Sequence, residues 1–582
     1  MRKILNLFDK KLKYQAVSLL VLMVIASFLE LIGIGLVILI LNFFLGITEA
    51  HTPFINTLLN FFSFQENSQN VYNILFFIII IFTIKLLILI FVSYKENNFY
   101  AIFREKISNK MYNNFLKRDV ILLLKKNSAI YLRNFTEELN LCVLFFTSLL
   151  KIILDSIILT TLLIFLFFFN FLVTFYVFFI FSIIGVLYFL YIKNKLSGWA
   201  QIGLHNRKKR IQFINESFLA IKSIKIFSRE NFFYKKLKLQ NKIFSELVFK
   251  VNFVKSLPTS FFEYILTISI IILFFFLLEQ NYPNERIIQI LSVYALVSFR
   301  IVPLINKVLG NSQHLRYSFP SVQKLVIEIN QKIIEKNKLI HKISFEKSIK
   351  LNFKEFSFDQ STKPFLRNIF LNIRKNSKIG IIGSSGAGKS TIIDILCGFR
   401  NFKSGSLKVD NKNVYKNIQG WQSIIGYIPQ NIIIFNDTLK KNILFGSNDQ
   451  NISDKKISKI IDLVDLTYLV KKSSRGLSQV INQDGLNISG GEKQRIGIAR
   501  ALINNPEIII LDEATSGLDF FTEKNVLNTI KKLNKTIIIV SHRLSSLSFC
   551  DKIYQVKQNT LKQIKQSNIK KIFLNNDLGY YN

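Results

Sequence analysis

Cysteines and acidic side chains are scarce in this chain of 582 residues. The three cysteines, Cys142, Cys397 and Cys550, lie far apart in the sequence, so neither a disulfide framework nor a zinc site is indicated. Lys and Arg number 76 against 37 Asp and Glu, which gives a formal net charge of +39. Such an excess can indicate nucleic-acid binding. However, the chain lacks an RNA-binding aromatic motif and its lysines are scattered, so the sequence favours a basic surface facing anionic lipid head groups.

A secretory signal peptide is not predicted either, although a basic N-terminal stretch is followed by apolar residues. The apolar run 17–45 is too long for the hydrophobic part of a signal peptide, and no clear cleavage site follows it. Similar runs recur up to about residue 310, whereas later apolar runs are short and broken by Gly, Asn and charged residues. This change of pattern predicts a membrane domain followed by a soluble domain.

Six apolar segments are long enough to cross a membrane, since a spanning helix needs about 20 mostly apolar residues. Segments 95–138 and 194–255 are long and basic, whereas segment 46–71 holds no Lys or Arg. This asymmetry predicts that both long segments and both termini are cytoplasmic. Segment 53–64 could form a short helix on the outer membrane surface or a partly buried loop. The six predicted spans lie at 15–45, 72–94, 139–168, 171–193, 256–279 and 284–309.

Ionisable side chains within these spans are candidates for function, because a charge in hydrocarbon is costly. Lys151 and Asp155 are four residues apart and could neutralise each other, and side chains near span ends could reach the head groups. Arg300 and Lys307 share a helix face, and Lys85 has no acidic residue near it in the sequence. Three cations facing one cavity would suit a phosphate-bearing lipid. The full set is Glu30, Lys85, Lys151, Asp155, Glu263, Arg300 and Lys307.

The stretch GSSGAGKST, residues 383–391, follows an apolar strand pattern and precedes a helix pattern. It matches the phosphate-binding P-loop completely. Its glycines let backbone N–H groups approach phosphates at a helix N-terminus, which favours anions. Lys389 would reach the β- and γ-phosphates, and Ser390 would hold Mg²⁺. The residues predicted to bind ATP here are Gly383, Ser384, Ser385, Gly386, Ala387, Gly388, Lys389, Ser390 and Thr391.

Two further stretches contain residues predicted to act on the phosphates of a bound nucleotide. An apolar run over Ile508–Leu511, typical of a buried parallel strand, ends in Asp512 and Glu513. Asp512 would complete the magnesium shell, and Glu513 would accept a proton from the attacking water. The stretch NISGGEKQRIGIARAL opens a long helix with a Ser-Gly-Gly turn, which creates a second anion site. Since one nucleotide does not need two cradles in one chain, this second site is predicted to act on ATP held by a partner chain.

These motifs, together with GYIPQN, LDEATSGLD and SHRLSSL, occur in the order found in the ATPase domain of an ABC transporter. The resemblance covers about 340–565, and with six spans ahead of it the whole chain resembles an ABC exporter half-transporter. It implies a membrane α-helical bundle with six transmembrane helices plus a C-terminal α/β P-loop NTPase domain. It also implies coupling helices near 123–133 and 216–228, and ATP and Mg²⁺ as cofactors, with the metal held by Ser390, Gln430 and Asp512.

The resemblance assigns further roles residue by residue. Glu513, His542 and Gln430 are expected to be catalytic, with His542 positioning the γ-phosphate and Gln430 linking Mg²⁺ and water to the membrane half. An aromatic ring usually stacks on adenine upstream of the P-loop, where this chain has Gln360, while the nearby Phe358 is more often a core residue. Glu492 replaces the usual Gln. The residues expected to contact ATP in trans are Ser489, Gly490, Gly491, Glu492 and, in the dimer-crossing loop, Asp519.

A narrower resemblance concerns the bacterial lipid-linked oligosaccharide flippases. It rests on the stretches SFLELIGIGLVILIL, GYIPQNIIIFNDTLKKNILFG and SVYALVSFRIVPLINKVLGNSQHLRY. In those flippases, basic residues line the cavity and meet the lipid pyrophosphate. Lys85, Arg300 and Lys307 fall where such residues would be expected, whereas Thr259 stands where another basic residue is expected.

The sequence therefore predicts a homodimeric, ATP-driven exporter of the bacterial inner membrane that flips or exports a lipid-linked saccharide or another phosphate-bearing lipid. A heterodimer stays open, and no nucleic-acid partner is expected. The main alternative is a general exporter of lipids, peptides or hydrophobic drugs, which the 57 Phe residues allow. An alternative of another class is a membrane-anchored regulatory ATPase without cargo. The expected domains are a transmembrane domain 1–320, a linker 321–347, an ATP-binding domain 348–565 and a tail 566–582.

Overall fold

The computed structural model contains two compact units, divided at about residue 334. We refer to them as the helical unit, which comes first in the chain, and the α/β unit. Within the helical unit, the last long helix continues to Ile329, past the predicted domain boundary at 320. The residues that the structure describes are 10–44, 68–125, 128–331, 342–358, 364–402, 404–447, 452–482, 485, 487–515, 520–541, 543–548 and 550–565.

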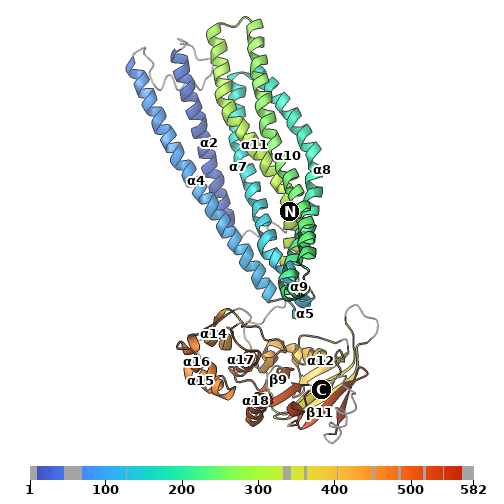
Figure 1. Ribbon diagram of the computed structural model, residues 1–582. Coiled ribbons are helices and arrows are strands. Elements are labelled where there is room, and N and C mark those ends of the chain that lie inside the picture. Colours follow the sequence, from blue (N-terminus) through green and yellow to red (C-terminus); the bar gives the residue numbers. More distant parts are fainter. Residues whose placement is uncertain are drawn as a thin grey trace. The chain divides into compact units, whose positions relative to one another are not determined.

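Long helices running side by side make up the helical unit (Figure 1). Short helical segments connect them: α5 (Val120–Leu124), α6 (Ser128–Arg133) and the π-helix η1 (Asn134–Glu138) precede α7, and α9 (Ile221–Ile226) precedes α10. Helix α6 lies in the expected coupling segment 123–133, which α5 overlaps, and α9 lies in the expected segment 216–228, whereas η1 follows the first segment. The long helices are α2 (Lys10–Phe44), α4 (Ser68–Leu116), α7 (Leu139–Phe169), α8 (Phe171–Leu219), α10 (Glu230–Glu279) and α11 (Asn284–Ile329).

Several of these helices are much longer than a bilayer is thick. Helix α4 has 49 residues, which at about 1.5 Å per residue gives roughly 74 Å, against about 30 Å of hydrocarbon. Among the described residues, five helices are long and apolar enough to cross a membrane, and they match five of the six predicted spans. The remaining predicted span, 171–193, lies in α8, where many side chains are outside the described residues. The outer-loop segment 53–64 and the tail also lie outside them.

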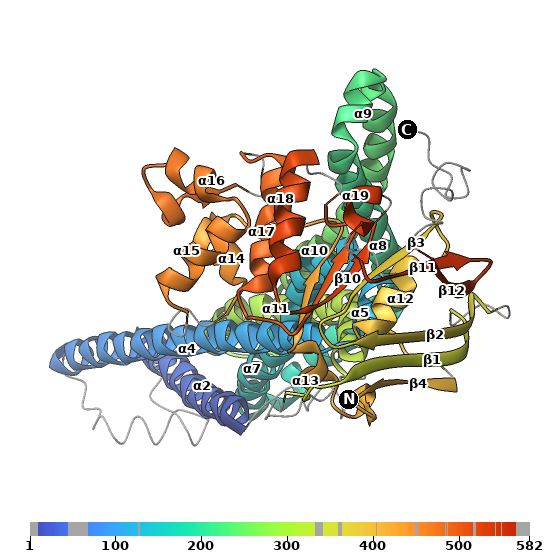
Figure 2. The same ribbon diagram turned by 90° about the horizontal axis from the view of Figure 1, so that it is seen from below.

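The α/β unit is built on two sheets. Its six-stranded sheet has the order β12-β11-β3-β10-β9-β6, in which only the edge strand β12 is antiparallel to its neighbour. An antiparallel sheet of order β2-β1-β4-β5 lies beside it (Figure 2), and the short pair β7 (Asp437–Thr438) and β8 (Val480–Ile481) lies apart. The strands are β1 (Ser348–Phe356), β2 (Leu366–Arg374), β3 (Lys378–Gly383), β4 (Ser404–Val409), β5 (Lys412–Asn413), β6 (Ile425–Ile428), β9 (Ile508–Asp512), β10 (Thr536–Val540), β11 (Lys552–Lys557) and β12 (Thr560–Ile564).

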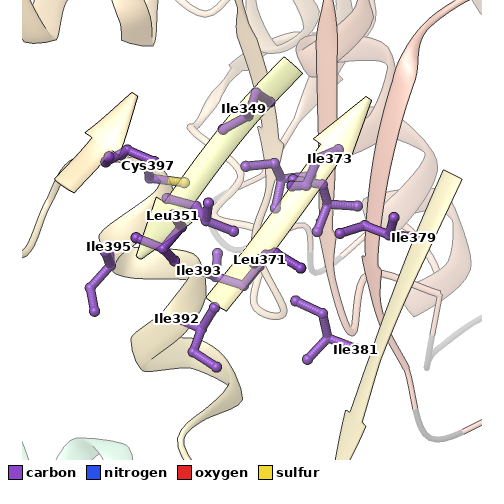
Figure 3. Packing of buried hydrophobic residues seen from close by; sticks show 14 of the residues in the cluster. Ile349, Leu351, Leu371, Ile373, Ile379, Ile381, Ile392, Ile393, Ile395 and Cys397 are labelled. Atoms are coloured by element: carbon purple, nitrogen blue, oxygen red, sulfur yellow. The ribbon is translucent and has the colours of Figure 1, made fainter. Parts of the chain in front are cut away.

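Helices cover these sheets and enclose several clusters of buried apolar side chains, of which one lies between β1, β2, β3 and α12. Side chains of β1, β2, β3 and α12 interdigitate in it, including Leu351, Leu371, Ile381 and Ile393 (Figure 3). Every residue of β10 is buried, as expected for a central parallel strand. The helices are α12 (Lys389–Leu396), α13 (Ile418–Gln422), α14 (Leu439–Leu444), α15 (Asp454–Leu463), α16 (Thr467–Lys472), α17 (Gly490–Leu502), α18 (Phe520–Lys532) and α19 (Leu544–Leu547).

The chain enters β1 through a turn held by Asp410. Its carboxylate accepts hydrogen bonds from the backbone N–H groups of Glu346, Lys347 and Ser348, the last two at 2.8 and 2.7 Å. Partial burial acts to raise the pKa of Asp410, but the three N–H groups outweigh it and bring the pKa below its usual value. The carboxylate therefore stabilises the fold in its charged form.

We expect Asp410→Ala to lower the free energy of unfolding of the α/β unit by about 1–2 kcal/mol at neutral pH, because three backbone donors lose their acceptor. Since the pKa is lowered on folding, the contribution is complete above about pH 4 and is lost as the pH falls through the folded-state pKa. Denaturant unfolding of both proteins at pH 7 and pH 3 measures the difference. A difference that does not shrink at pH 3 would contradict the assignment.

Candidate functional site

The phosphate-binding loop lies between β3, which ends at Gly383, and α12, which begins at Lys389. Gly386 and Gly388 have φ angles of +77° and +107°, where a side chain is strained. A Cβ atom on Gly388 would also lie 2.8 Å from Leu366 Cδ2. Glycine is therefore required at Gly388, and the loop presents backbone N–H groups at a helix N-terminus, where an anion is stabilised.

Lys389 lies across this loop. Its Nζ donates hydrogen bonds to the backbone oxygens of Gly383 and Ser384, at 2.8 and 2.9 Å. Burial lowers the pKa of Lys389, and the carboxylates of Glu513 and Asp512 oppose this effect. The amino group of Lys389 thus lies at the P-loop near two carboxylates, where it can reach bound phosphate.

The two carboxylates end the buried strand β9, as predicted. Burial raises the pKa of Asp512, and the neighbouring charge of Glu513 adds to the effect. The hydroxyl of Tyr427 donates to Asp512 Oδ2 at 3.3 Å, and Gln430 Nε2 donates to Glu513 Oε2 at 2.8 Å. Glu513 has a φ of +53°, a conformation that is unfavourable for a non-glycine residue and is found at functional sites.

These side chains fit a magnesium ion. Mg²⁺ prefers oxygen ligands and usually takes one or two carboxylates together with substrate phosphates. Ser390 supplies an exposed hydroxyl, Asp512 a carboxylate and Gln430 an amide oxygen. The repulsion between Asp512 and Glu513 that raises the pKa of Asp512 would be relieved by a cation.

The second anion site begins helix α17. The hydroxyl of Ser489 accepts from the N–H of Glu492 at 3.2 Å, and the N–H of Ser489 donates to the Glu492 carboxylate at 2.6 Å. This reciprocal pair is a capping box. The capping box explains why Glu492 can replace the usual Gln. Either side chain can accept a hydrogen bond from the Ser489 N–H. At Gly490, no atom lies within 4 Å of a Cβ position, so the backbone is open to a ligand.

Comparison with known proteins identifies this arrangement. The family model "ABC transporter" matches residues 366–516, and the model "ABC transporter transmembrane region" matches residues 15–300. The chain belongs to the ABC transporters.

Solved structures and curated relatives agree with this assignment. The transporter superimposes on the structure of a bacterial Atm1-family ABC exporter with ATP bound, with a TM-score of 0.78 over 97% of each chain at 17% identity, which is a likeness of fold. It is 38% identical over 231 residues to a protein of Rickettsia prowazekii named "Putative export ATP-binding/permease protein". That match spans only 38% of this chain and 40% of the relative. The heterocyst differentiation ATP-binding protein HepA of Nostoc sp. is 28% identical over 69% of this chain and 67% of its own length.

In the transporter's α/β unit, the structure brings together Lys389, Asp512, Glu513 and Gln430, as the sequence predicted. The residues at the start of α17 make no hydrogen bond or ion pair with the P-loop in the part of this unit that the structure describes. Their predicted contact with ATP in trans stays a prediction. His542 and Asp519 lie outside the described residues, as does Gln360.

An aromatic group beside the P-loop was not anticipated from the sequence. The ring of Phe358 is 38% exposed and lies 4.9 Å from the ring of Phe365, centroid to centroid. A Cβ on Gly388 would lie 3.2 Å from Phe365, so this pair borders the loop. The guanidinium of Arg400 lies 5.1 Å from the ring of Phe358. Phe358 is thus half-exposed next to the phosphate site and not a core residue.

In the transporter's helical unit, acidic residues from other helices pair with most of the predicted cations. One carboxylate oxygen of Glu30, on α2, forms an ion pair with Lys85 Nζ of α4 at 2.5 Å. The other oxygen forms an ion pair with Arg300 Nε of α11 at 3.0 Å. Lys85 is buried, whereas half of the Arg300 side chain is exposed. Lys151 pairs with Glu96 of α4 at 3.5 Å, so its ion pair is made between helices and not with Asp155.

Lys307 takes no part in the Glu30 group and lines a separate cavity. This cavity has a volume of about 470 Å³ and is bounded by α2, α4, α7 and α11. We call it the charged cavity. The side chain of Thr259 lies outside the described residues. The polar residues that line the charged cavity are Ser93, Glu96, Lys151, Asp155, Lys307, Asn311 and His314.

A buried carboxylate that the sequence did not reveal connects the two strand-end loops. Glu523 is 1% exposed, and its oxygens accept hydrogen bonds from Thr515 Oγ1 at 2.9 Å, Ser546 Oγ at 2.5 Å and Arg543 Nη1 at 2.8 Å. Thr515 follows Glu513 by two residues, and Arg543 follows the loop after β10. Glu523 thus fixes the segment that carries the proposed base.

We expect Glu523→Ala to lower the free energy of unfolding of the α/β unit by about 2–3 kcal/mol, because hydrogen bonds to a buried charge are lost. ATP hydrolysis should fall with it, since the loop of Glu513 is no longer held. Glu523→Gln keeps two acceptor sites and serves as the milder control. Denaturant unfolding and ATPase rates of the three proteins measure the effect, and an Ala variant as stable as the wild type would rule out this role.

Proposed function

We propose that the transporter is an ATP-driven exporter that carries a phosphate-bearing amphiphile, such as a lipid-linked saccharide, across the bacterial inner membrane to the outer leaflet. The observation that carries this proposal is the charged cavity. Two cations, Lys307 and Lys151, line it together with two acids, Glu96 and Asp155, on helices long and apolar enough to span a membrane. Charged residues in spans mark substrate paths, because burying them in hydrocarbon is costly.

In a homodimer, ATP binding and hydrolysis would supply the energy for export. ATP binds on the P-loop of one chain, and the α17 start of the other chain, Ser489 to Glu492, closes over its γ-phosphate. The open backbone at Gly490 supports such an approach. By the family resemblance, Asp519 crosses the dimer and His542 positions the γ-phosphate. The half-exposed ring of Phe358 is well placed to stack on the base.

Glu513 is the proposed general base. Its carboxylate is held by Gln430, whose amide lies within hydrogen-bond distance, so the base and the water-positioning residue move together. Ser390, Asp512 and Gln430 would hold Mg²⁺, which neutralises charge developing on the phosphates. Closure of the ATPase domains is transmitted through the short helices α5, α6 and α9, and hydrolysis resets the transporter.

An apolar cavity supports the second candidate function, a general exporter of lipids or hydrophobic drugs. It has a volume of about 220 Å³ and lies between α7, α8, α10 and α11, with residues such as Leu163, Phe262 and Ile301 in its walls. A regulatory ATPase without cargo would need neither cavity. The charged cavity favours the phosphate-bearing cargo, because an apolar compound would leave Lys307 without a direct ion-pair partner among the described residues.

We expect Glu513→Gln to trap an ATP-bound closed dimer, because the amide cannot accept the proton of the attacking water. ATP hydrolysis should fall by a factor of at least about 100, while ATP binding persists. Size exclusion with ATP and single-turnover hydrolysis measure both properties. Normal turnover in this variant would show that the base is assigned to the wrong residue.

The cargo is tested by the ATPase rate of the full-length protein in nanodiscs, with and without a polyprenyl-pyrophosphate glycan. We expect stimulation by this lipid and not by unphosphorylated lipids or drugs. The variant Lys307→Gln should lose the stimulation, because it removes a cation that lines the charged cavity. Lys250→Gln, which removes an exposed cation of α10, is the matched control. Stimulation by drugs alone would remove the proposed cargo and leave the exporter.

A further inference from the structure

The charges of the helical unit fall into paired and unpaired groups. Glu30 neutralises Lys85 and Arg300, and Glu96 neutralises Lys151. Among the described residues, neither Asp155 nor Lys307 forms an ion pair. A charged side chain without an ion-pair partner in a spanning helix is costly. Two such charges of opposite sign therefore need an explanation.

Both unpaired charges line the same space. Asp155 of α7 and Lys307 of α11 border the charged cavity, and they interact electrostatically without making direct contact. Next to Lys307, Gly310 adds no side chain to the cavity wall, and among the described residues no neighbouring side chain or other helix comes within 4 Å of where its Cβ would lie. Besides the Lys151–Glu96 ion pair, the cavity thus offers the carboxylate of Asp155 and the ammonium group of Lys307, which make no direct ion pair with each other among the described residues.

The two opposite charges of Asp155 and Lys307 favour one class of lipid head group over others. A head group with phosphate alone would pair with Lys307 but face the carboxylate of Asp155. An uncharged head group would leave both unpaired. A zwitterionic head group, with an ammonium and a phosphate, satisfies both charges at once, and buried charges are stable only when paired in this way.

We propose that the charged cavity binds a zwitterionic head group, with Lys307 contacting its phosphate and Asp155 contacting its ammonium group. This inference rests on the proposed function and narrows its cargo to amphiphiles that carry both groups. Lys151 and Glu96 also line the cavity, but they pair with each other, as Lys85 and Glu30 do outside it, so neither pair needs a cargo to be neutral.

The experiment uses the full-length protein in nanodiscs of digalactosyldiacylglycerol, which carries neither phosphate nor amine. The ATPase rate is titrated with phosphatidylethanolamine, with phosphatidic acid and with a dialkylammonium lipid of matched chains. For the wild type, we expect half-maximal stimulation by phosphatidylethanolamine at a roughly tenfold lower concentration than by phosphatidic acid, as one charged contact is added. The ammonium lipid should not stimulate.

Variants then separate the two contacts. Asp155→Asn should respond equally to phosphatidylethanolamine and phosphatidic acid, while Lys307→Gln should lose the response to both. The exchange Asp155→Lys with Lys307→Asp keeps both charges and should restore the preference for the zwitterion, which also shows that the helices still fold. Glu263→Gln removes an exposed acid of α10 outside the cavity and should behave as the wild type.

The outcomes separate a failure of the zwitterion site from a failure of the proposed function. Equal responses of the wild type to both phosphate lipids, or an unchanged preference in Asp155→Asn, would overturn the zwitterion site and leave the exporter of phosphate-bearing lipids. A wild type that responds to no phosphate lipid would overturn the proposed cargo, and the inference with it. In the last comparison, the ATPase rate is measured with soluble phosphoethanolamine in place of the lipid. Stimulation by it as strong as by the lipid would keep the paired contacts but overturn their assignment to a membrane lipid.

Discussion

A charged group that leaves water has to find an opposite charge nearby, because an isolated buried ion is far less stable than a solvated one. Both units of this transporter are arranged around that constraint. In the α/β unit, Lys389 lies between the P-loop oxygens and the carboxylates of Asp512 and Glu513. In the helical unit, one carboxylate, Glu30, compensates two cations from two other helices. The positions of the helices and strands that carry these groups are therefore tied to each other by charge as well as by packing.

The same constraint explains why the nucleotide site is ready for a ligand. Asp512 and Glu513 repel each other at the end of a buried strand, and burial adds to the cost, so the pKa of Asp512 is raised. Bound phosphate with its metal ion brings the charges that resolve this conflict. The backbone around them is prepared in advance by the left-handed conformation of Glu513 and by the capping box of α17. The left-handed conformation of Glu513 costs folding energy, which the surrounding apolar core supplies, whereas the capping box stabilises the start of α17.

A second constraint on the helical unit is the length of its helices relative to the thickness of the bilayer. Helices of about 50 residues exceed the bilayer, so their polar parts continue outside the hydrocarbon and carry the short connecting helices α5, α6 and α9. Within the unit, charges gather on the faces of α2, α4, α7 and α11 that meet each other. A fully buried acid, Glu138 of η1, lies 3.3 Å from Arg133 and 3.8 Å from Lys324 of α11, which ties the connecting segment to the last long helix.

Sequence alone determined the two-part architecture and the elements of the nucleotide site, because each motif is a run of neighbouring residues whose local geometry suffices. The P-loop, the strand ending in Asp512 and the helix after Ser489 all lie where the sequence predicted them. Tertiary structure decided which charges meet. Lys85 has no acid nearby in the sequence, yet it pairs with Glu30, and Lys151 pairs with Glu96 and not with Asp155 on its own helix. Phe358 and Glu523 likewise have partners farther along the chain, Arg400 and Arg543, because such contacts depend on packing that no local pattern encodes.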